Sequence, residues 1–552
     1  MARREIFDVC VIGTGAGGGV MIQQLCAAGL SVVALERGRA LNTSHFISDD
    51  ELSVVIRDEL FSPGQLETWR PDENTPTETG RFNMLAYCVG GTITHWAGWA
   101  WRFRPDDFKV LSTEGALAGA NLADWPFTYE ELAPYYDQAE REFGVAGKAG
   151  ANPFGSPQTQ EYPNPPHPDR RMGKIFTRGA EKLGLHPFPV PMAINPRPYG
   201  GRPACMYGGA CQQYGCHIGA KATTFSVSLP RALATGRLDL RARARATEIT
   251  LEEDGLARSV RYLDAAGAEQ EVFARQFVVA GGPVGTAHLL LTSKSSSFPR
   301  GLANSSDQVG RNLTLHTGPS VSFVVDEPAR GFTGLETHTG LDDWHASDAR
   351  RGFIRGGVVA DFNMTTKQPI MYATLGSDGN AEAKRGWGAD YKSFLRDFPR
   401  TVGMIGILED LPMESNRIDL DPHVNDTQGM PAVRITHRQH PNDVAMARWY
   451  EERMLDLADA AGAQKKWAIR ALSGIDEPGR GGAHIHGTCR MGEDPERSVV
   501  DRWCRSHDVK NLWVVDGSVF PTSGGYNPTL TILANAYRVA DHFIAEGKKQ
   551  SL

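Results

Sequence analysis

The fold of this chain is decided by residues 7–18, which read FDVCVIGTGAGG. The first six residues form a compact β-type run, and a helical pattern follows the glycines as far as Gly29. In such a strand, turn and helix, Gly13 permits the tight turn, Gly15 lets the backbone approach a pyrophosphate, and Gly18 allows close helix packing. Phosphates bind at the helix N-terminus, where free N–H groups and the helix dipole favour anions. The stretch therefore predicts a dinucleotide-binding unit.

The next predicted strand supports the same interpretation. It covers residues 31–35 and ends in Glu36, an acidic residue at about the distance from the glycines expected of a ribose-hydroxyl acceptor. A negative charge there favours FAD or NAD over a 2'-phosphorylated ligand. A glycine motif alone also occurs in chance loops, but the flanking strand, helix and acid together indicate a dinucleotide site.

Length and composition limit the class of protein. A chain of 552 residues exceeds what one hydrophobic core usually serves, so two or more domains are expected. The formal net charge of -7 gives no bias towards nucleic acids or membrane surfaces. No stretch reaches the ~18 to 20 apolar residues of a membrane helix. Arg3 and Arg4 imitate a secretory signal, but the apolar run behind them leads into the glycine turn, so we expect a strand and no signal peptide.

Three further segments make a family resemblance specific. Residues 90–102 read GGTITHWAGWAWR, residues 277–291 read FVVAGGPVGTAHLLL, and a long C-terminal run begins at His484. With the N-terminal glycine motif, these segments resemble the glucose-methanol-choline (GMC) oxidoreductases, a family of FAD enzymes. Within that family the chain is most similar to the bacterial sugar dehydrogenase large subunits (glucose, gluconate and fructose dehydrogenases) and to glucoside 3-dehydrogenases.

The resemblance implies a fold and a domain arrangement. The fold is α/β, or α+β overall, with a Rossmann-like FAD-binding domain and an interleaved substrate domain built on an antiparallel sheet. We expect a discontinuous FAD-binding domain made of residues 1–110, 205–312 and 480–552. Residues 111–204 and 313–479 then form the substrate-binding domain.

The resemblance also implies which residues contact the flavin. Gly90 and Gly91 let the backbone lie against the flavin, while Asp516 and Gly517 follow what resembles the last strand of the FAD-binding sheet. His95 occupies the place where some relatives attach a histidine covalently to the flavin. Taken alone, a histidine among tryptophans is more often a packed core residue, so both interpretations of His95 stay open.

Two C-terminal segments carry the expected catalytic pair. Residues 483–492 resemble the family segment that begins with the catalytic base, here His484, and Asn527 stands where the second active-site residue is His or Asn among relatives. Alcohol oxidation needs removal of the hydroxyl proton as hydride leaves carbon, which suits neutral imidazole, and flavin N5 accepts the hydride. We interpret His486 as a structural neighbour. A metal pair of His484 and His486 is disfavoured, because the sequence near them offers no carboxylate or third histidine.

A cysteine-rich loop is the remaining unusual feature. Cys205, Cys211 and Cys216 are candidate ligands of an iron–sulfur cluster, because some bacterial glucose dehydrogenases of this family carry a three-iron cluster at a corresponding loop. In those relatives two cysteines are adjacent, whereas here Met206 follows Cys205, and a thioether is a poor substitute for a thiolate. The alternative is a disulfide pair with one free thiol.

The activity implied by the resemblance is FAD-dependent oxidation of a sugar or glycoside hydroxyl, at C1 or C3 of a glucose-type ring, to a lactone or ketone. Electrons then pass to a cytochrome, quinone or dye, with a cytochrome and a small companion subunit as partners. Such a subunit often carries the export signal, so cytoplasmic and periplasmic locations both stay open. Two alternatives keep the fold: an oxidase that uses oxygen, and a redox-neutral lyase. A non-catalytic subunit is disfavoured because His484 and Asn527 are both present.

Overall fold

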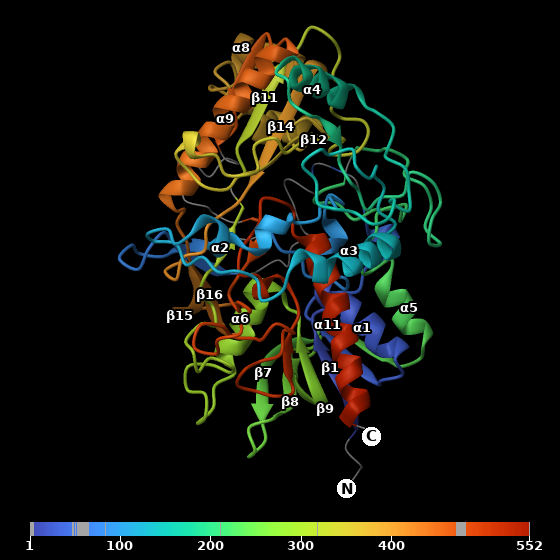
Figure 1. Cartoon of the computed structure of the whole chain (residues 1–552), viewed down its shortest axis with the longest axis vertical. Coiled ribbons are helices and arrows are strands. Elements are labelled where there is room, and N and C mark those ends of the chain that lie inside the picture. Colours follow the sequence, from blue (N-terminus) through green and yellow to red (C-terminus); the bar gives the residue numbers. More distant parts are fainter. Residues whose placement is uncertain are drawn as a thin grey trace.

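Two large sheets organise the chain, one in each half of its long axis (Figure 1). The computed structural model describes residues 5–46, 49, 51, 66–82, 84–209, 211–316, 318–470 and 482–550. Arg3 and Arg4, together with residues 480–481 and 551–552 of the expected third FAD-binding segment, lie outside the described residues. None of the described helices combines the length and the apolar character that crossing a membrane requires.

The lower sheet has a parallel core in the order β6-β2-β1-β9, with β19 also parallel to β9. The first half of β9 pairs with β8 in antiparallel fashion, and β8 in turn pairs with the antiparallel strand β7. Parallel strands covered on both faces are apolar along their whole length, and β2 is buried throughout. The strands are β1 (Ile6–Ile12), β2 (Val32–Glu36), β6 (Leu238–Ala242), β7 (Arg245–Leu251), β8 (Ala257–Leu263), β9 (Glu269–Val279) and β19 (Leu512–Val514).

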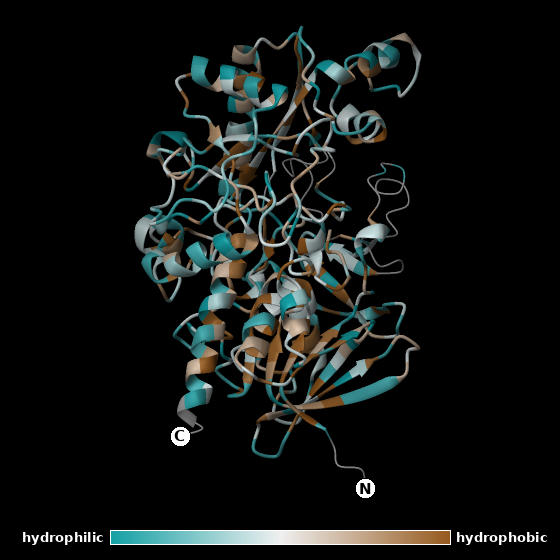
Figure 2. Ribbon diagram, turned by 90° about the vertical axis from the view of Figure 1, so that its right-hand side faces the viewer, coloured by the Kyte–Doolittle hydropathy of each residue, from teal (hydrophilic) through white to brown (hydrophobic). Residues whose placement is uncertain are grey.

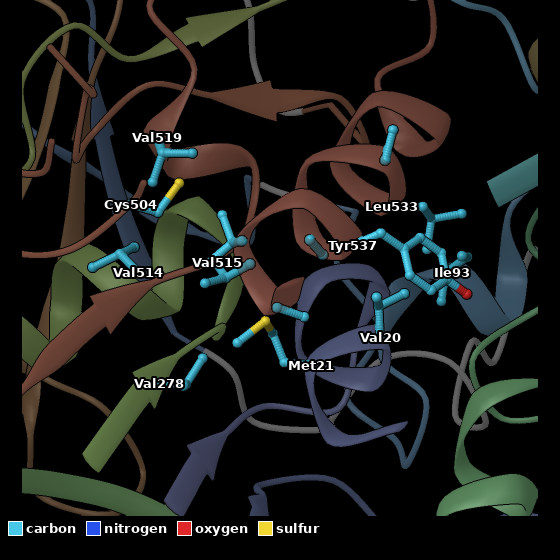
Figure 3. Packing of buried hydrophobic residues seen from close by; sticks show 14 of the residues in the cluster. Val20, Met21, Ile93, Val278, Cys504, Val514, Val515, Val519, Leu533 and Tyr537 are labelled. Carbon is cyan, nitrogen blue, oxygen red and sulfur yellow. The ribbon is translucent and has the colours of Figure 1, made fainter. Parts of the chain in front are cut away.

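Helices α1 (Ala16–Ala27) and α11 (Thr529–Gln550) pack against each other beside this sheet (Figure 1). Figure 3 shows Val20 and Met21 of α1 and Leu533 of α11 in one buried hydrophobic cluster. In Figure 2, α11 carries both brown and teal residues, as expected of a helix with one buried side. The remaining helices of this half are α5 (Ser228–Ala234) and α6 (Gly282–Thr292).

The upper sheet is antiparallel throughout, in the order β17-β11-β14-β13-β12-β5. Helices α4 (Arg171–Lys182) and α9 (Pro441–Ala461) pack together on this sheet (Figure 1). Side chains alternate between the two faces of a strand. The helix-covered face takes Val402, Met404 and Leu408 of β14. The strands are β5 (Phe188–Pro189), β11 (Ser320–Val324), β12 (Thr339–Leu341), β13 (Gly357–Asp361), β14 (Thr401–Leu408) and β17 (Lys465–Ala468).

Two smaller sheets join distant parts of the chain. One has the order β15-β16-β3-β4 and comprises β3 (Glu67–Arg70), β4 (Glu78–Gly80), β15 (Arg417–Asn425) and β16 (Pro431–Thr436). The other pairs β10 (Thr314–Leu315) with β18 (Ile485–His486) in antiparallel fashion. The other α-helices among the described residues are α2 (Val110–Glu114), α3 (Tyr129–Phe143), α7 (Pro369–Ala373) and α8 (Gly388–Arg396). The short 3-10 helices are η1 (Thr43–His45), η3 (Thr92–His95), η4 (Pro105–Phe108), η5 (Ala349–Arg351), η6 (Leu375–Ser377), η7 (Phe398–Arg400) and η8 (Gly517–Val519).

A parallel sheet with flanking helices and a separate antiparallel sheet confirm the predicted fold class. The strand, turn and helix expected from residues 7–18 are present as β1, the turn and α1. The exact division of the chain into domains stays a prediction.

Candidate active site

A cavity of about 750 Å³ is lined by residues of both large sheets. Gly13 and Glu36 come from the carboxyl ends of β1 and β2, whereas Ile405 and Ile407 come from β14. Ligands of open parallel sheets bind at this carboxyl edge. The predicted site residues that line the cavity are Gly13, Gly15, Glu36, Gly91, His95, His484, Asp516, Gly517 and Asn527. The predicted residues outside its lining are Gly18, Gly90, Cys205, Cys211 and Cys216.

Two glycine turns meet at one end of the cavity. Gly13 has a φ of +100°, and a Cβ there would overlap the carbonyl oxygen of Ala280. A Cβ on Gly91, whose φ is +62°, would lie 2.7 Å from the Cα of Gly15. Helix α1 begins with Gly15 as its N-cap and no side-chain cap, which leaves its first N–H groups available to a ligand. The turns form a narrow backbone cradle suited to a pyrophosphate.

Close helix packing behind the cradle involves two glycines. A Cβ on Gly18 would overlap the carbonyl oxygen of Gly13 and lie 3.1 Å from the Cβ of Ala280. A Cβ on Gly17 would overlap the carbonyl oxygen of Val515, just after β19. The sequence motif pointed to Gly18 alone, because the approach of β19 to α1 joins segments far apart in the chain.

Two buried carboxylates hold this end of the site together. Glu36 accepts hydrogen bonds from the hydroxyl of Thr14 at 2.7 Å and from the amide of Gly38 at 2.9 Å. Asp516 accepts from the amide of Gly282 at 2.9 Å, at the start of α6. Burial raises the pKa of both carboxyls. Each oxygen of a carboxylate can accept more than one hydrogen bond, so Glu36 retains capacity for a ligand hydroxyl.

His95 lies on the cavity wall without a hydrogen-bond partner. Its ring is 5% exposed, and neither ring nitrogen is hydrogen-bonded. Burial, and to a lesser degree the nearby Lys221 ammonium, lowers the pKa of His95 well below its usual range. Buried polar groups without partners are rare in proteins, which points to a ligand contact at this position. The geometry alone fits both a covalent and a hydrogen-bonded ligand.

His484 stands between Asn527 and a second histidine, His316. The amide nitrogen of Asn527 lies 3.0 Å from Nε2 of His484, and Nδ1 of His316 lies 3.0 Å from Nδ1 of His484. Nε2 of His316 lies 3.2 Å from the carbonyl oxygen of Ser523 and must donate to it. A neutral His316 then accepts at Nδ1, so His484 is protonated at Nδ1 and basic at Nε2.

These histidines are uncharged at neutral pH. Burial lowers the pKa of His316 to about 4 and that of His484 to about 3, and for His484 the neighbouring His316 adds to the effect. The arrangement thus presents an unprotonated imidazole nitrogen beside an amide N–H, as removal of a hydroxyl proton requires.

Sequence reasoning missed His316. It directly follows β10, and His484 directly precedes β18. The antiparallel pairing of Leu315 with Ile485 therefore brings the two histidines opposite each other. The sequence contains no spacing that signals this contact, because the paired strands are short and far apart along the chain.

His486 is not part of the cavity lining, and its ring packs beside His316 with a centroid distance of 4.9 Å. Its ring is fully buried, stacks on Phe520 with a centroid distance of 5.8 Å, and has no hydrogen-bond partner. Within the described residues, metal-ligand atoms from three side chains come within 4.8 Å of one another only at Asp106, Asp107 and His345. At that place the Arg355 guanidinium already pairs with both carboxylates.

The cysteine loop contains free thiols. All eight cysteines lie in the described residues and all are free, so the disulfide alternative is wrong. Burial raises the pKa of the Cys211 thiol to about 12, while the Lys221 ammonium opposes this shift. Met206 is 75% exposed beside Cys205. The iron–sulfur cluster therefore stays a prediction.

Comparison with known proteins agrees with this geometry. The fold and the cavity define the class of flavoprotein oxidoreductases that act on CH–OH groups. Family models described as GMC oxidoreductase match residues 121–318 and residues 412–536, as the N-terminal and C-terminal parts of the family. With relatives at more than 30% identity along nearly the whole chain, this chain belongs to the GMC oxidoreductase family, and its cofactor is FAD.

Three curated relatives illustrate the family's range. The chain is 34% identical to 2-methyl-1,2-propanediol dehydrogenase of Mycolicibacterium austroafricanum, over 97% of this chain and 94% of that protein. It is 35% identical to paromamine 6'-oxidase of Streptomyces fradiae, over 97% of this chain and 91% of that protein. It is 29% identical to the fructose dehydrogenase large subunit of Gluconobacter japonicus, over 98% of each.

Solved structures share the fold. Pyridoxine 4-oxidase from Mesorbium loti superimposes with a TM-score of 0.68 at 17% identity, covering 97% of this chain and 99% of that one. An FAD-dependent oxidoreductase from Chaetomium thermophilum gives a TM-score of 0.64 at 16% identity, covering 98% of this chain and all of that one. Identities this low support the architecture alone.

Proposed function

We propose that the chain is an FAD-dependent dehydrogenase that oxidises a sugar or glycoside hydroxyl, at C1 or C3 of a glucose-type ring, and passes the electrons to a cytochrome, quinone or dye. The carrying observation is the basic Nε2 of His484 beside the amide of Asn527 on the cavity wall. Oxidation of an alcohol needs such a base and such a donor near the hydroxyl group.

The residues of the cavity fit FAD. The cradle of Gly13, Gly15 and Gly91 suits the pyrophosphate, with Gly18 and Gly90 supporting it from behind, and Glu36 suits the ribose hydroxyls. Asp516, Gly517 and the unpartnered His95 would lie along the rest of the cofactor. When bound, FAD supplies the hydride acceptor.

The protein groups would act in a defined order. In the structure the amide of Asn527 donates to Nε2 of His484. A substrate hydroxyl would take the place of this amide at Nε2, and the amide N–H would then donate to the substrate oxygen. Nε2 of His484 then takes the hydroxyl proton as hydride leaves the carbon. His316 accepts from Nδ1–H of His484 and so keeps the base in the required tautomer. The positive charge that develops on His484 is spread by this hydrogen bond.

The first test is an anaerobic visible spectrum of the purified protein before and after glucose and methyl glucoside, followed by a dye and then by oxygen. We expect either sugar to bleach the flavin band and the dye to restore it faster than oxygen does. If oxygen restores the flavin band faster than the dye does, the protein is an oxidase rather than a dehydrogenase. If sugar is consumed without bleaching, the redox-neutral lyase takes its place.

The same spectrum tests the cysteine loop. The Lys221 ammonium donates to the carbonyl oxygen of Cys211 at 2.7 Å and places a positive charge in this loop, which supports an anionic cluster held by Cys205, Cys211 and Cys216. A broad shoulder that survives bleaching, with iron and acid-labile sulfide in the protein, is the expected result. A protein free of iron after anaerobic purification would contradict it. We also propose a small companion subunit for this protein. If that subunit carries an export signal the location is periplasmic, and otherwise it is cytoplasmic.

A covalent link between His95 and the flavin is also part of this proposal. Acid precipitation of the wild-type protein should leave the yellow colour in the pellet, because the bond survives unfolding, whereas His95→Ala should release it. His45→Ala, which changes an exposed histidine, serves as the matched control and should behave as wild type. Yellow colour entirely in the wild-type supernatant would rule out the link.

A further inference from the structure

The side of the cavity formed by the upper sheet is an apolar wall. Ile405 and Ile407 line it from β14, on the face opposite the residues that pack against α9. Phe362 and Met364, which follow β13, and Trp99 complete the apolar wall. The rings of Trp99 and Phe362 are in edge contact with a centroid distance of 5.9 Å. Four of the five side chains are buried, and Ile405 is half-buried.

This apolar wall lies close to the catalytic histidines. The amide of Gly406, between the two isoleucines, donates to the carbonyl oxygen of Pro319 at 2.8 Å. Pro319 is three residues from His316, which contacts His484 directly. His484 and the two isoleucines line the same cavity, so a substrate whose hydroxyl reaches His484 has the isoleucines within the space that it occupies.

Several uncharged polar atoms on this side of the cavity have no hydrogen-bond partner. Gln213 is 5% exposed and lines the cavity, yet neither atom of its side-chain amide has a hydrogen-bond partner. Its backbone has a φ of 68°, which non-glycine residues rarely adopt, and its N–H donates to the carbonyl oxygen of His95 at 2.9 Å. The indole nitrogen of Trp99 and the amide oxygen of Asn527 are buried without partners as well. Such groups recognise hydroxyls.

Formal charges are missing from this part of the lining. Within the described residues, the lining contributed by residues 95–99, 212–213, 316–318, 362–364 and 405–407 contains no Asp, Glu, Lys or Arg. The charged residues of the lining come from elsewhere: Glu36, Arg37, Glu67, Arg243, Arg245, Asp264, Asp426 and Asp516. Hence a charged group held against the apolar wall would lose its hydration and find no counter-charge in this lining. The buried Lys221 ammonium lies behind the lining and donates to the carbonyl oxygens of Trp96, Cys211 and Tyr214.

We propose that the substrate is an uncharged hydroxyl compound with an apolar face or substituent beside the reacting carbon, and that Gln213 binds one of its other hydroxyl groups. Alkyl and aryl glycosides are the sugars of this class, whereas sugar acids and amino sugars are excluded. This inference rests on the proposed function and narrows its substrate to one chemical class.

The test compares five sugars by the rate of anaerobic flavin reduction: phenyl glucoside, methyl glucoside, glucose, gluconate and glucosamine. We expect the second-order rate constant of flavin reduction to be at least roughly 10-fold higher for phenyl glucoside than for glucose. An added apolar contact of this size raises such a rate constant by about 10-fold or more. Gluconate and glucosamine should be at least about 100-fold slower than methyl glucoside, since burying an unpaired charge is costly. Either charged sugar within 10-fold of methyl glucoside would overturn the proposal.

Two further measurements separate this inference from the proposed function. The first adds an uncharged diol with an apolar substituent, 1-phenyl-1,2-ethanediol. If it bleaches the flavin and no sugar does, the substrate class holds and the sugar part of the proposed function falls. If neither it nor any sugar bleaches the flavin, both fall.

The second measurement uses variants. Ile405→Lys places an ammonium on the apolar wall and should shift the ratio of gluconate to phenyl glucoside rates upward by at least about 10-fold. Gln213→Leu should lower kcat/KM for glycosides and leave the phenyl diol less affected. Leu395→Lys, on an exposed part of α8, is the control for an added lysine. An unchanged ratio in a folded, yellow Ile405→Lys protein would contradict the position of the apolar wall.

Discussion

Replacing His484 by Ala is expected to leave FAD bound and to slow flavin reduction by substrate at least ~100-fold, the usual scale for loss of a general base. The cradle that suits the cofactor is formed by backbone of the turns after β1 and before η3 and does not involve His484. Among the described side chains that line the cavity, only His484 is hydrogen-bonded to the amide nitrogen of Asn527. Within the described lining, no second base is therefore in place beside Asn527 when His484 is removed. Stopped-flow absorbance of anaerobic enzyme measures the rate constant directly. A reduction rate close to wild type would remove His484 from the mechanism.

Variants at two other histidines, His423 and His316, test whether the effect is specific to the base. His423→Ala changes an exposed histidine and should reduce at the wild-type rate. His316→Leu removes the acceptor for Nδ1–H of His484 and should slow flavin reduction, whereas His316→Gln restores an acceptor oxygen and should recover part of the rate.

Because burial holds the pKa of His484 near 3, the rate of flavin reduction by the wild-type protein should stay constant from about pH 6 to about pH 8. A fall in rate below a midpoint near pH 6.5 would indicate an ordinary, solvated imidazole.

The second large effect concerns stability. Replacing Arg355 by Leu is expected to lower the free energy of unfolding by about 3–5 kcal/mol, because it leaves buried carboxylates without a counter-charge. The Arg355 guanidinium is fully buried, donates to Glu409 at 2.8 Å and pairs with Asp107. Burial alone would raise the pKa of Asp107, but its interactions with His345 and the Arg355 guanidinium lower it to about 2. These ion pairs connect η4, which contains Asp107, with the residues just before β13 and just after β14. Their loss therefore weakens the contact between η4 and the upper sheet.

Chemical unfolding of the FAD-loaded protein measures this effect as a shift of the midpoint. Arg350→Ala is the matched control, because the Arg350 and Asp348 ion pair lies at the surface, with the arginine side chain 89% exposed. Solvent screens such pairs, so the midpoint should not move. An unchanged midpoint for Arg355→Leu would mean that water or proton uptake replaces the guanidinium.

Local sequence patterns predicted the dinucleotide end of the site well. Strand, glycine turn, helix and acid follow one another within residues 7–36, and each requirement is a matter of backbone conformation or short-range spacing. Gly13 has the positive φ that its place in the turn demands, and Glu36 ends β2 as expected. The sequence motif did not identify Gly17. A side chain at this position is excluded by the carbonyl oxygen of Val515, which lies near the other end of the chain.

The sequence by itself determined the fold class and the family and predicted His484 and Asn527 as the catalytic pair, because these features are encoded in contiguous motifs. Only the tertiary structure decided which partner fixes the tautomer of His484 and what surrounds the substrate. His316 reaches its position through the pairing of β10 with β18, and the apolar wall through the alternation of side chains on β14. Contacts of this kind depend on which strands pair and in which register, and that is set by packing of the whole molecule rather than by any local stretch.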